Sequence, residues 1–436
     1  MASESMAFLP VTPSTPARIP RVAGLIALRG EAAFLVAIGP GESDVSTHGG
    51  YAPLNYDRSM SLKSNIVQRV YRSAPFSVAM KAFGRMHGVT IAREGDVVHL
   101  SSGNKLAKVS VRQSRFLPEL VGNLDAYFEA FPYAESGGLK VLDLSLNPAP
   151  LFNYRICRSN HVNIRFHSDL VWLEKDGVAA VLSPSHAVYA GDIAMHFDSY
   201  VLPLKPGLRE GKQVVDFTRP GILQTYKASG LQFEMAFIPE EIEAIEDYQK
   251  WYKPQPGDLV FDIGAHCGVS SYYLSQMVGP AGRVICFEPD PTNFELLRRN
   301  IERHRLTNVT AVQMALAGSS GTLAFNSEGT IGSGLATLLD RNSVGKIVEV
   351  QAITLEEAFR RWGVPKLCKI DIEKAEIEVL RSSAEILKYQ KPHFVIDTNH
   401  LIDGILTTRA VEAMLREYGY EVESGGTFAT TWARPA

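Results

Sequence analysis

Cysteine is scarce in this chain, and its placement excludes a disulfide-stabilised or zinc-bound fold. The 436 residues contain four cysteines, Cys157, Cys267, Cys286 and Cys368. None of them forms a C-x-x-C pair or stands at metal-ligand spacing from a histidine, and two fall in expected buried strands. We therefore interpret them as reduced, structural thiols of a cytoplasmic protein.

Net charge and long apolar runs are also lacking. The formal net charge of -3 gives no bulk attraction to nucleic acid or to an anionic membrane. No run approaches the roughly 18 apolar residues that a membrane-spanning helix needs, and no basic segment precedes an apolar one at the N-terminus. We therefore expect no nucleic-acid partner, no membrane partner and no signal peptide. A hydrophobic fraction of 45% over this length supports the cores of two or three domains.

An apolar strand followed by a glycine-containing loop is the most informative segment that is present. The strand runs into Asp262, and the loop contains Gly264 and Gly268. Residues 269–278 are expected to form a helix, after which a second apolar strand ends at Glu288. This pattern predicts a βαβ unit with a carboxylate at the carboxyl end of each strand, where open α/β sheets bind ligands.

The loop lacks one glycine of a dinucleotide-binding loop. A G-x-G-x-x-G loop lets backbone N–H groups close on a pyrophosphate, whereas the pattern here is Asp262-x-Gly264-x-x-x-Gly268. The Asp262 carboxylate would also repel a diphosphate. S-adenosylmethionine has no phosphate and offers ribose hydroxyls to Glu288. We therefore expect this cofactor, with Asp262 supporting its amino-acid end; a turn without a ligand is the alternative.

The first half of the chain repeats a pattern. Residues 89–100 and 170–182 both look like hairpins, and Asp143 and Asp216 each end a strand 18 residues after an earlier Asp. This similarity predicts an α+β accessory region with a duplicated unit of about 50 to 60 residues, against the alternative of chance likeness. Neither Asp leads into a paired-glycine loop, so we expect this region to bind substrate or a partner subunit and not the cofactor.

The second half alternates strands with helices, which predicts an α/β fold with a doubly wound sheet. Asp290 is expected to cap a helix that begins at Pro291. Further strands are expected at 309–314, 323–325, 346–352, 367–371, 393–397, 420–422 and 428–432, and further helices at 355–362, 375–387 and 410–418.

Three segments resemble the FkbM family of S-adenosylmethionine-dependent methyltransferases. Residues 260–268 resemble its first cofactor motif, 284–294 its strand-two acid and helix start, and 369–376 its K-I-D-[VI]-E-G-A-E signature. Lys374 stands where the family prefers glycine. The resemblance covers about 231–436 and implies a seven-stranded, mostly parallel Rossmann-like sheet and O-methylation of a hydroxyl on a small metabolite or glycan.

Four segments follow from these patterns. We expect a weakly ordered or accessory segment at 1–60, a first accessory unit at 61–168 and a second at 169–230, followed by the methyltransferase domain at 231–436. The candidate cofactor-binding residues are Asp262, Gly264, Ala265, His266, Gly268, Glu288, Pro289, Asn293 and Ala315.

The candidate catalytic residues are two carboxylates and a histidine. A hydroxyl nucleophile needs a base within hydrogen-bond reach. Asp371 is the first candidate for base or substrate-positioning acid, Glu373 the second, and His400 a base or substrate ligand. In the alternative, Asp371 caps the next helix and Glu373 lies at its positive end. Asp371, Glu373 and Asp397 offer oxygen ligands for Mg²⁺, but no spacing requires a metal, and none is expected.

The leading functional hypothesis is an S-adenosylmethionine-dependent O-methyltransferase acting on a hydroxyl of a small molecule or glycan, with homo-oligomerisation left open. A catalytically silent binding module is a second hypothesis, motivated by Lys374 and the appended units. A nicotinamide-dependent oxidoreductase is a third, which the missing glycine disfavours.

Overall fold

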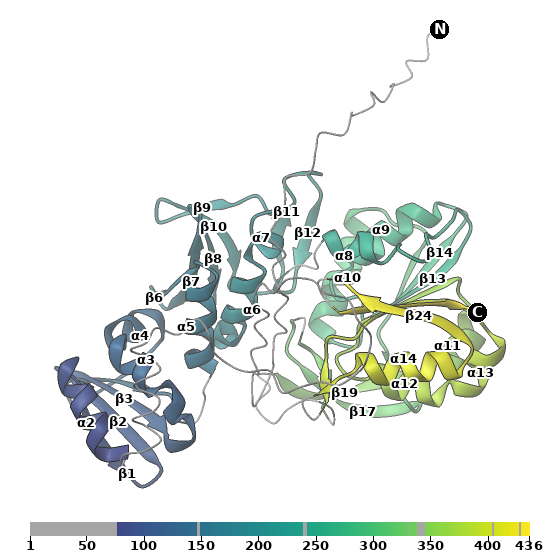
Figure 1. The fold of residues 1–436 in the computed structure, drawn as a ribbon. Helices are drawn as coiled ribbons and strands as arrows, with labels where there is room; N and C mark the ends of the chain where they lie inside the picture. The colour runs from purple at the N-terminus through teal and green to yellow at the C-terminus, as the bar shows by residue number, and fades with distance from the viewer. Residues whose placement is uncertain are drawn as a thin grey trace, which may run out of the picture.

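The computed structural model describes residues 76–145, 149–238, 242–330, 332–336, 338, 345–402, 405–426 and 429–436. The expectation for residues 1–60 therefore lies outside the described residues. Two small units and a larger α/β domain follow one another along the chain, with a hairpin between the second unit and the domain (Figure 1).

The first unit is a five-stranded sheet, in the order β1-β2-β3-β5-β4, covered by helices. Alternate side chains are buried along its central strands, for example Val98 and Leu100 in one strand and Ala107 and Val109 in the next. Its elements are α2 (Phe76–Met86), β1 (Thr90–Glu94), β2 (Val97–Ser102), β3 (Lys105–Ser110), the 3₁₀ turn η1 (Val111–Phe116), α3 (Leu117–Gly122), α4 (Leu124–Ala130), β4 (Ala134–Ser136) and β5 (Leu139–Asp143).

The second unit has the same element order and the corresponding strand order, β6-β7-β8-β10-β9. Its elements are α5 (Ala149–Ser159), β6 (Asn163–His167), β7 (Leu170–Lys175), β8 (Val178–Leu182), the 3₁₀ turn η2 (Pro184–Tyr189), α6 (Ala190–Met195), α7 (Phe197–Tyr200), β9 (Gly207–Arg209) and β10 (Lys212–Phe217). In both units the central strand bears the parallel partner, β3 with β5 and β8 with β10.

The corresponding elements show that the expected alignment of the hairpins is wrong by one strand. Residues 170–175 correspond to β2, so the counterpart of the 89–100 hairpin is β6–β7 and not 170–182. Strand-end residues Asp143 and Asp216 do correspond, and each accepts hydrogen bonds from the backbone and hydroxyl of the residue two positions on. Each unit is also longer than expected, because the helix ahead of its first hairpin, α2 or α5, belongs to it.

Two expected domain boundaries fall inside hairpins. The boundary between 168 and 169 separates β6 from β7, which pair along their whole length. The boundary between 230 and 231 separates β11 (Ile222–Thr225) from β12 (Gln232–Met235), which are antiparallel partners. Hairpin strands fold as a pair, so the first boundary belongs between β5 and α5 and the second after β12.

The larger domain contains a seven-stranded mixed sheet in the order β15-β14-β13-β20-β21-β25-β24. The first five strands are mutually parallel, and β25 is antiparallel to both of its neighbours. The strands are β13 (Leu259–Ile263), β14 (Arg283–Phe287), β15 (Val309–Val312), β20 (Leu367–Ile370), β21 (His393–Asp397), β24 (Tyr420–Gly425) and β25 (Thr430–Pro435).

Helices cover both faces of this sheet (Figure 1). Alternate strand residues face opposite layers, since Val260 and Val284 pack with one set of helices and Phe261 and Ile285 with the other. The helices are α8 (Ile242–Asp247), α9 (Val269–Val278), α10 (Pro291–Arg303), α11 (Leu355–Trp362), α12 (Glu376–Ser382), α13 (Ala384–Tyr389) and α14 (Thr408–Glu417). Smaller sheets are formed by β16 (Ala315–Leu316), β17 (Gly321–Ser327), β18 (Gly334–Leu335) and β19 (Lys346–Ile353), and by β22 (Leu401–Ile402) and β23 (Ile405–Leu406).

Most elements of this domain lie where the sequence predicts them. The helix at 269–278 is found with those bounds, and Asp290 caps α10 by accepting from the N–H groups of Thr292 and Asn293. The helix expected at 375–387 is instead two short helices that meet at Ser383.

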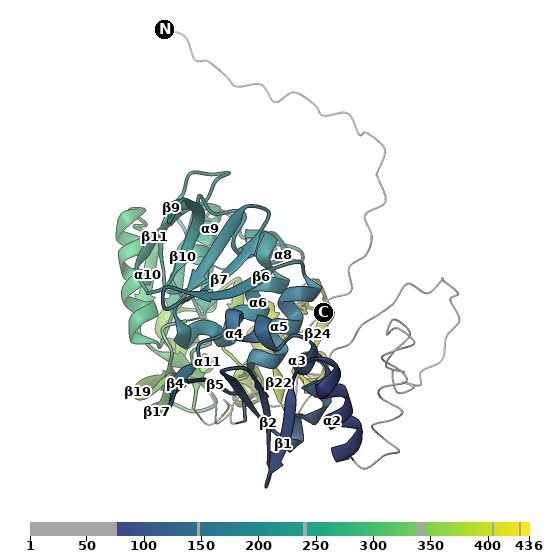
Figure 2. The same cartoon turned by 90° about the vertical axis from the view of Figure 1, so that its left-hand side faces the viewer.

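An apolar contact joins the second unit to the larger domain. One hydrophobic cluster includes residues of both small units together with Cys267, Val269 and Leu296. Asn300 of α10 fixes the intervening hairpin, because its side chain accepts from the Glu234 N–H at 2.8 Å and donates to the carbonyls of Glu234 and Cys267 at 2.9 and 2.8 Å. The turned view shows the second unit and α10 side by side (Figure 2).

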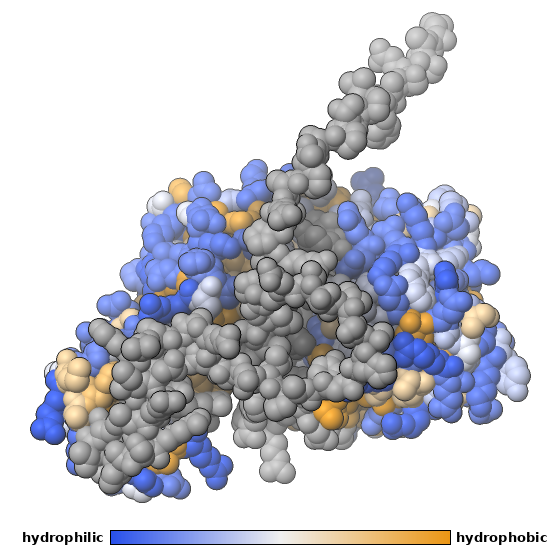
Figure 3. Space-filling view, in the orientation of Figure 1, coloured by the Kyte–Doolittle hydropathy of each residue, from blue (hydrophilic) through white to orange (hydrophobic). Residues whose placement is uncertain are grey.

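The surface of the described residues is mainly hydrophilic where it is visible in Figure 3. The most exposed large apolar side chains, including Met86, Leu208 and Tyr389, belong to three separate elements or loops. All four cysteines are free and buried, as expected. Among the described helices, none has the length and apolarity to cross a bilayer.

Candidate active site

Two glycines shape the loop that follows β13. Gly264 and Gly268 have φ values of +80° and +88°, which disfavour residues with a side chain. A Cβ on Gly264 would lie 1.8 Å from the carbonyl oxygen of Asp371, and one on Gly268 would lie 2.6 Å from Leu297 Cδ1. The loop therefore touches the strand end that carries Asp371, which brings the expected cofactor loop and the expected catalytic acid together.

Glu288 lies beside this loop at the end of β14. It is 5% exposed, and its two oxygens accept from the backbone N–H groups of His266 at 2.8 Å and Asp290 at 2.9 Å. Burial raises the pKa of Glu288 to about 8, and the two N–H donors and the charge of Lys369 only partly offset this. Each oxygen retains a second acceptor position for an incoming hydroxyl.

Asp262 is fully enclosed near the end of β13, and its support of the amino-acid end of the cofactor stays a prediction. Its side chain has no exposed surface, and its Oδ2 accepts from the hydroxyls of Ser270 at 2.8 Å and Ser271 at 2.6 Å. A carboxylate that is enclosed in this way holds the start of α9 against β13. The structure therefore does not offer it for direct contact with a cofactor.

Lys369 links the acids at this edge of the sheet. It is 1% exposed, and its Nζ donates to the carbonyl of Gly264 at 3.0 Å. The same nitrogen lies 3.7 Å from Asp262 Oδ1 and 4.0 Å from Asp371 Oδ2. The sequence analysis assigned it no role, although a lysine within an apolar strand is a signal, because a buried ammonium needs partners.

The N-terminus of α10 carries two further predicted residues. Asn293 is buried, and its Nδ2 donates to the Thr330 carbonyl at 3.1 Å, whereas its Oδ1 has no hydrogen-bond partner among the described residues. Pro289 connects Glu288 to the cap residue. Ala315 is 5% exposed and packs in the cluster of the four-stranded sheet.

The three predicted catalytic residues come together. His400 Nε2 lies 3.8 Å from Asp371 Oδ1 and 3.9 Å from Glu373 Oε2. Glu376, fully buried, completes the cluster, with its Oε1 3.1 Å from His400 Nδ1 and accepting from the Ile372 N–H at 3.2 Å. Sequence reasoning quoted Glu376 within the family signature but gave it no role.

The charges of this cluster decide which member can accept a proton. Burial alone would lower the pKa of His400, but Glu376, Glu373 and Asp371 outweigh it and raise that pKa to about 10. His400 is therefore an imidazolium near neutral pH, a form that cannot accept a proton, and its role as base or substrate ligand stays a prediction. The side chain of Asp371 is 37% exposed, so it remains the accessible carboxylate.

The loop after Asp371 has unusual backbone geometry. Glu373 and Lys374 have φ values of +51° and +81°. A glycine adopts such angles without strain, which accounts for the family preference at the position of Lys374. Helix α12 has Ala375 as its N-cap, with no capping side chain, so Asp371 does not cap it as the alternative proposed.

Asp397 is separate from this cluster. Its oxygens accept from Thr430 Oγ1 at 3.0 Å and Tyr248 OH at 3.4 Å. Among the described residues, no group of three or more His, Cys, Asp or Glu side chains is arranged to hold a metal ion. The structure therefore gives no support to the magnesium set of Asp371, Glu373 and Asp397.

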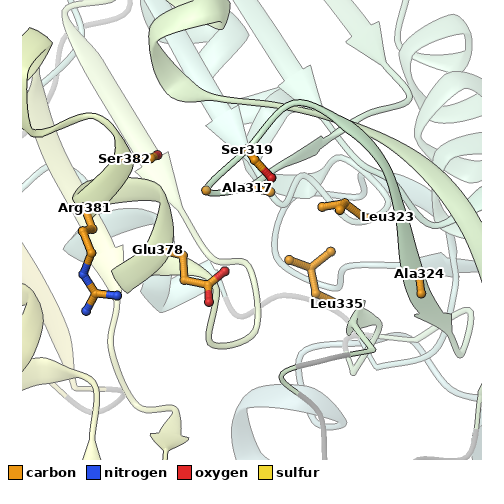
Figure 4. Close-up of a pocket in the computed structure, with 9 residues that line it drawn as sticks. Ala317, Ser319, Leu323, Ala324, Leu335, Glu378, Arg381 and Ser382 are labelled. Atoms are coloured by element: carbon orange, nitrogen blue, oxygen red, sulfur yellow. The ribbon is translucent and has the colours of Figure 1, made fainter.

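A surface cavity of about 360 Å³ lies between α12 and the four-stranded sheet. Figure 4 shows Glu378 extending from the helix toward Leu323 and Leu335 on the opposite wall. The complete lining is Ala317, Gly318, Ser319, Leu323, Ala324, Leu335, Glu378, Arg381 and Ser382. This set includes none of the candidate catalytic or cofactor-binding residues, so the cavity is distinct from the site described above.

Comparison with known proteins assigns this strand edge to a family. Residues 262–422 match the family model described as the methyltransferase FkbM domain. The chain contains an FkbM-family methyltransferase domain. All candidate catalytic and cofactor-binding residues fall within the matched segment.

Two curated relatives and one solved structure illustrate the likeness. The 31-O-demethyl-FK506 methyltransferase FkbM of Streptomyces tacrolimicus is 29% identical over 212 residues, which are 41% of this chain and 78% of the relative. Methyltransferase sdnD of Sordaria araneosa is 26% identical over 227 residues, 44% of this chain and 84% of the relative. The crystal structure of an FkbM methyltransferase from Methylobacillus flagellatus has 12% identity and a TM-score of 0.31, covering 68% of this chain and 67% of that one.

The FkbM domain implies S-adenosylmethionine as the cofactor, and the residues at the strand edge fit it. Gly264 and Gly268 let the loop pack closely on Asp371 and Leu297 in a left-handed conformation that a side chain would disfavour. Glu288 presents a buried carboxyl with spare acceptor positions, and Asn293 Oδ1 is a buried acceptor without a partner among the described residues. Hydroxyl and amino donors of an adenosine are the groups that such acceptors need.

Proposed function

We propose that the protein is an S-adenosylmethionine-dependent O-methyltransferase that acts on a hydroxyl of a small metabolite or glycan. The observation that carries the proposal is the position of Asp371, a partly exposed carboxylate whose backbone touches Gly264 of the cofactor loop. A base in that place can take the proton of an acceptor hydroxyl. The name of one relative, 31-O-demethyl-FK506 methyltransferase, indicates an oxygen acceptor in that protein.

The chain's residues have separable tasks in this proposal. The cofactor supplies an activated methyl group when it is bound. Glu288 holds the ribose hydroxyls, and Lys369 anchors the loop through the Gly264 carbonyl. Asp371 orients the acceptor hydroxyl and accepts its proton, while the imidazolium of His400 balances the charge of the surrounding carboxylates.

Replacing Asp371 by asparagine tests the proposal. Asp371→Asn keeps the shape of the side chain but removes the proton acceptor, so turnover should fall by about 10² or more while affinity for S-adenosylhomocysteine stays within about threefold. Turnover is measured as S-adenosylhomocysteine release in the presence of a panel of hydroxylated acceptors. The matched control is Asp143→Asn, which makes the same change at a strand end of the first unit and should leave turnover unaltered.

Three results would argue against parts of the proposal. Wild-type turnover in Asp371→Asn would remove the base assignment. Cofactor binding without turnover on any acceptor would favour a catalytically silent binding module. Binding of NAD in place of S-adenosylhomocysteine would favour the oxidoreductase alternative, which the family match does not support.

We further propose that the two accessory units arose by duplication and that they serve the substrate or a second subunit. Their shared strand order and the matching turns at Asp143 and Asp216 support the duplication. The FkbM family model matches residues 262–422, a segment that lies wholly outside these units.

A further inference from the structure

A tyrosine of the second unit reaches into the methyltransferase domain. Tyr189, the last residue of η2, is 5% exposed and donates a hydrogen bond from its hydroxyl to the carboxylate of Glu328. The same hydroxyl lies 3.1 Å from Thr330 Oγ1. The accessory unit therefore contacts the loop after β17 through one hydroxyl group.

That loop is tied in turn to the helix cap beside the cofactor acid. Thr330 Oγ1 accepts from the Gly332 N–H at 3.0 Å, and the hydroxyl of Ser333 donates to Asp290 Oδ2 at 2.7 Å. The N–H of Gly329 donates to the same oxygen at 3.1 Å. The backbone N–H of Gly329 and the hydroxyl of Ser333 therefore both donate hydrogen bonds to the same oxygen of Asp290.

The connection ends at the residue that we assign to the ribose. The N–H of Asp290 donates to Glu288 Oε1 at 2.9 Å, and Asn293 Nδ2 donates to the carbonyl oxygen of Thr330 at 3.1 Å. A continuous series of hydrogen bonds therefore runs from the accessory unit to Glu288. Such a series of bonds favours one arrangement of the groups that it joins.

The first unit supplies a natural comparison. Its η1 turn occupies the same place in the element order as η2 and ends at Phe116, which has no hydroxyl. Phe116 is buried against Phe152, with ring centroids 4.8 Å apart. Tyr189 likewise packs on Phe237, at 5.2 Å. Both rings therefore pack in a hydrophobic core. Of the two residues, the one that carries a hydroxyl lies in the unit that adjoins the catalytic domain.

We propose that Tyr189 is a positioning residue of the methyltransferase site, which completes the cofactor pocket from the accessory unit by holding Glu328–Thr330 and Ser333 against the cap of α10. This inference rests on the proposed cofactor site at Glu288. It assigns a function to a residue outside the matched FkbM segment, 262–422. Without the hydroxyl, the loop loses its hydrogen bonds to Tyr189, and the cofactor must order that loop when it binds.

The test uses the full chain and Tyr189→Phe, which keeps the packed ring and removes the hydroxyl. Affinity for S-adenosylhomocysteine, measured by calorimetry, should fall about 3- to 30-fold, which is less than the full loss of a hydrogen bond to a charged group, because Tyr189 acts on the cofactor through the loop. The matched control is Tyr127→Phe in the first unit, because the Tyr127 hydroxyl is buried without a hydrogen-bond partner among the described residues. That variant should bind as the wild type does.

A double-mutant comparison separates positioning from general stability. Ser333→Ala should also weaken binding, and the combination with Tyr189→Phe should weaken it by less than the product of the two single effects, because both act on one loop. Effects that multiply independently would overturn the inference, as would wild-type affinity in Tyr189→Phe. A wild-type protein that binds no S-adenosylhomocysteine would overturn the cofactor assignment and this inference together.

Discussion

Glu288 shows how one buried carboxyl couples cofactor binding to pH. Burial raises its pKa to about 8, so near pH 7 most of the cofactor-free protein carries a neutral carboxyl here. Ribose hydroxyls that donate to this group favour its ionised form. Binding therefore releases a proton, and affinity must rise as the pH increases toward the pKa.

We predict that wild-type affinity for S-adenosylhomocysteine increases between pH 6 and pH 8, by up to about tenfold per pH unit. Calorimetry at several pH values measures the trend. Glu288→Gln cannot ionise, so it should bind more weakly at pH 8, by about 10- to 100-fold, and lose most of the slope. An equal slope in this variant would assign the pH dependence to another group.

At the scale of single residues, the sequence predicted the positions of the acidic residues but not the protonation states within the site. Asp371, Glu373 and His400 were predicted as candidates, and the structure brings each of the two carboxylates within 4 Å of His400. The protonation of His400 depends also on Glu376, and the enclosure of Asp262 depends on two helix serines. Such effects arise from three-dimensional neighbours, which a pattern of residue types does not specify.

Elements with a strong local signal were predicted well, and those defined by pairing were not. The sequence predicted α9 and α10 correctly, because the glycines that flank α9 and the aspartate that caps α10 are local features. The hairpin correspondence between the two units slipped by one strand, because neighbouring hairpins share the same alternation. The two domain boundaries were misplaced for the same reason, because the sequence does not show which strands pair, as β11 and β12 do.

The buried side chain of Asn300 on α10 holds the β11–β12 hairpin, whose Glu234 also pairs with the more exposed Arg299 and Arg303. Asn300 is 1% exposed and makes three hydrogen bonds to the hairpin and to the cofactor loop. We predict that Asn300→Ala lowers the free energy of unfolding by about 2 to 3 kcal/mol, because it leaves buried backbone groups unpaired. Chemical denaturation measures the change. Arg299→Ala, an exposed ion-pair change on the same helix, should stay within about 0.5 kcal/mol, and an equal loss there would contradict the argument.

At the scale of the whole molecule, the methyltransferase domain and the second unit share a core. Phe233 of the hairpin packs on Tyr272 and His304, and the cluster that includes it extends from both units to Leu296. A fragment of residues 231–436 lacks β11 and exposes this surface. We predict that the fragment unfolds without the cooperative transition of the full chain and binds a hydrophobic dye, as followed by circular dichroism and fluorescence. A cooperative fragment with full cofactor affinity would show that the shared core is dispensable.

The same shared core has a consequence for the order in which the protein is made. Translation completes the second unit while about 200 residues of the methyltransferase sheet, up to β25, are still to come, an interval of roughly 10 to 40 s at ordinary elongation rates. During that time, the residues of the shared core that pack against Cys267, Val269 and Leu296 lack these partners. The nascent second unit is therefore a surface onto which the catalytic half assembles, and this stage of synthesis is the one at which a chaperone would protect the chain.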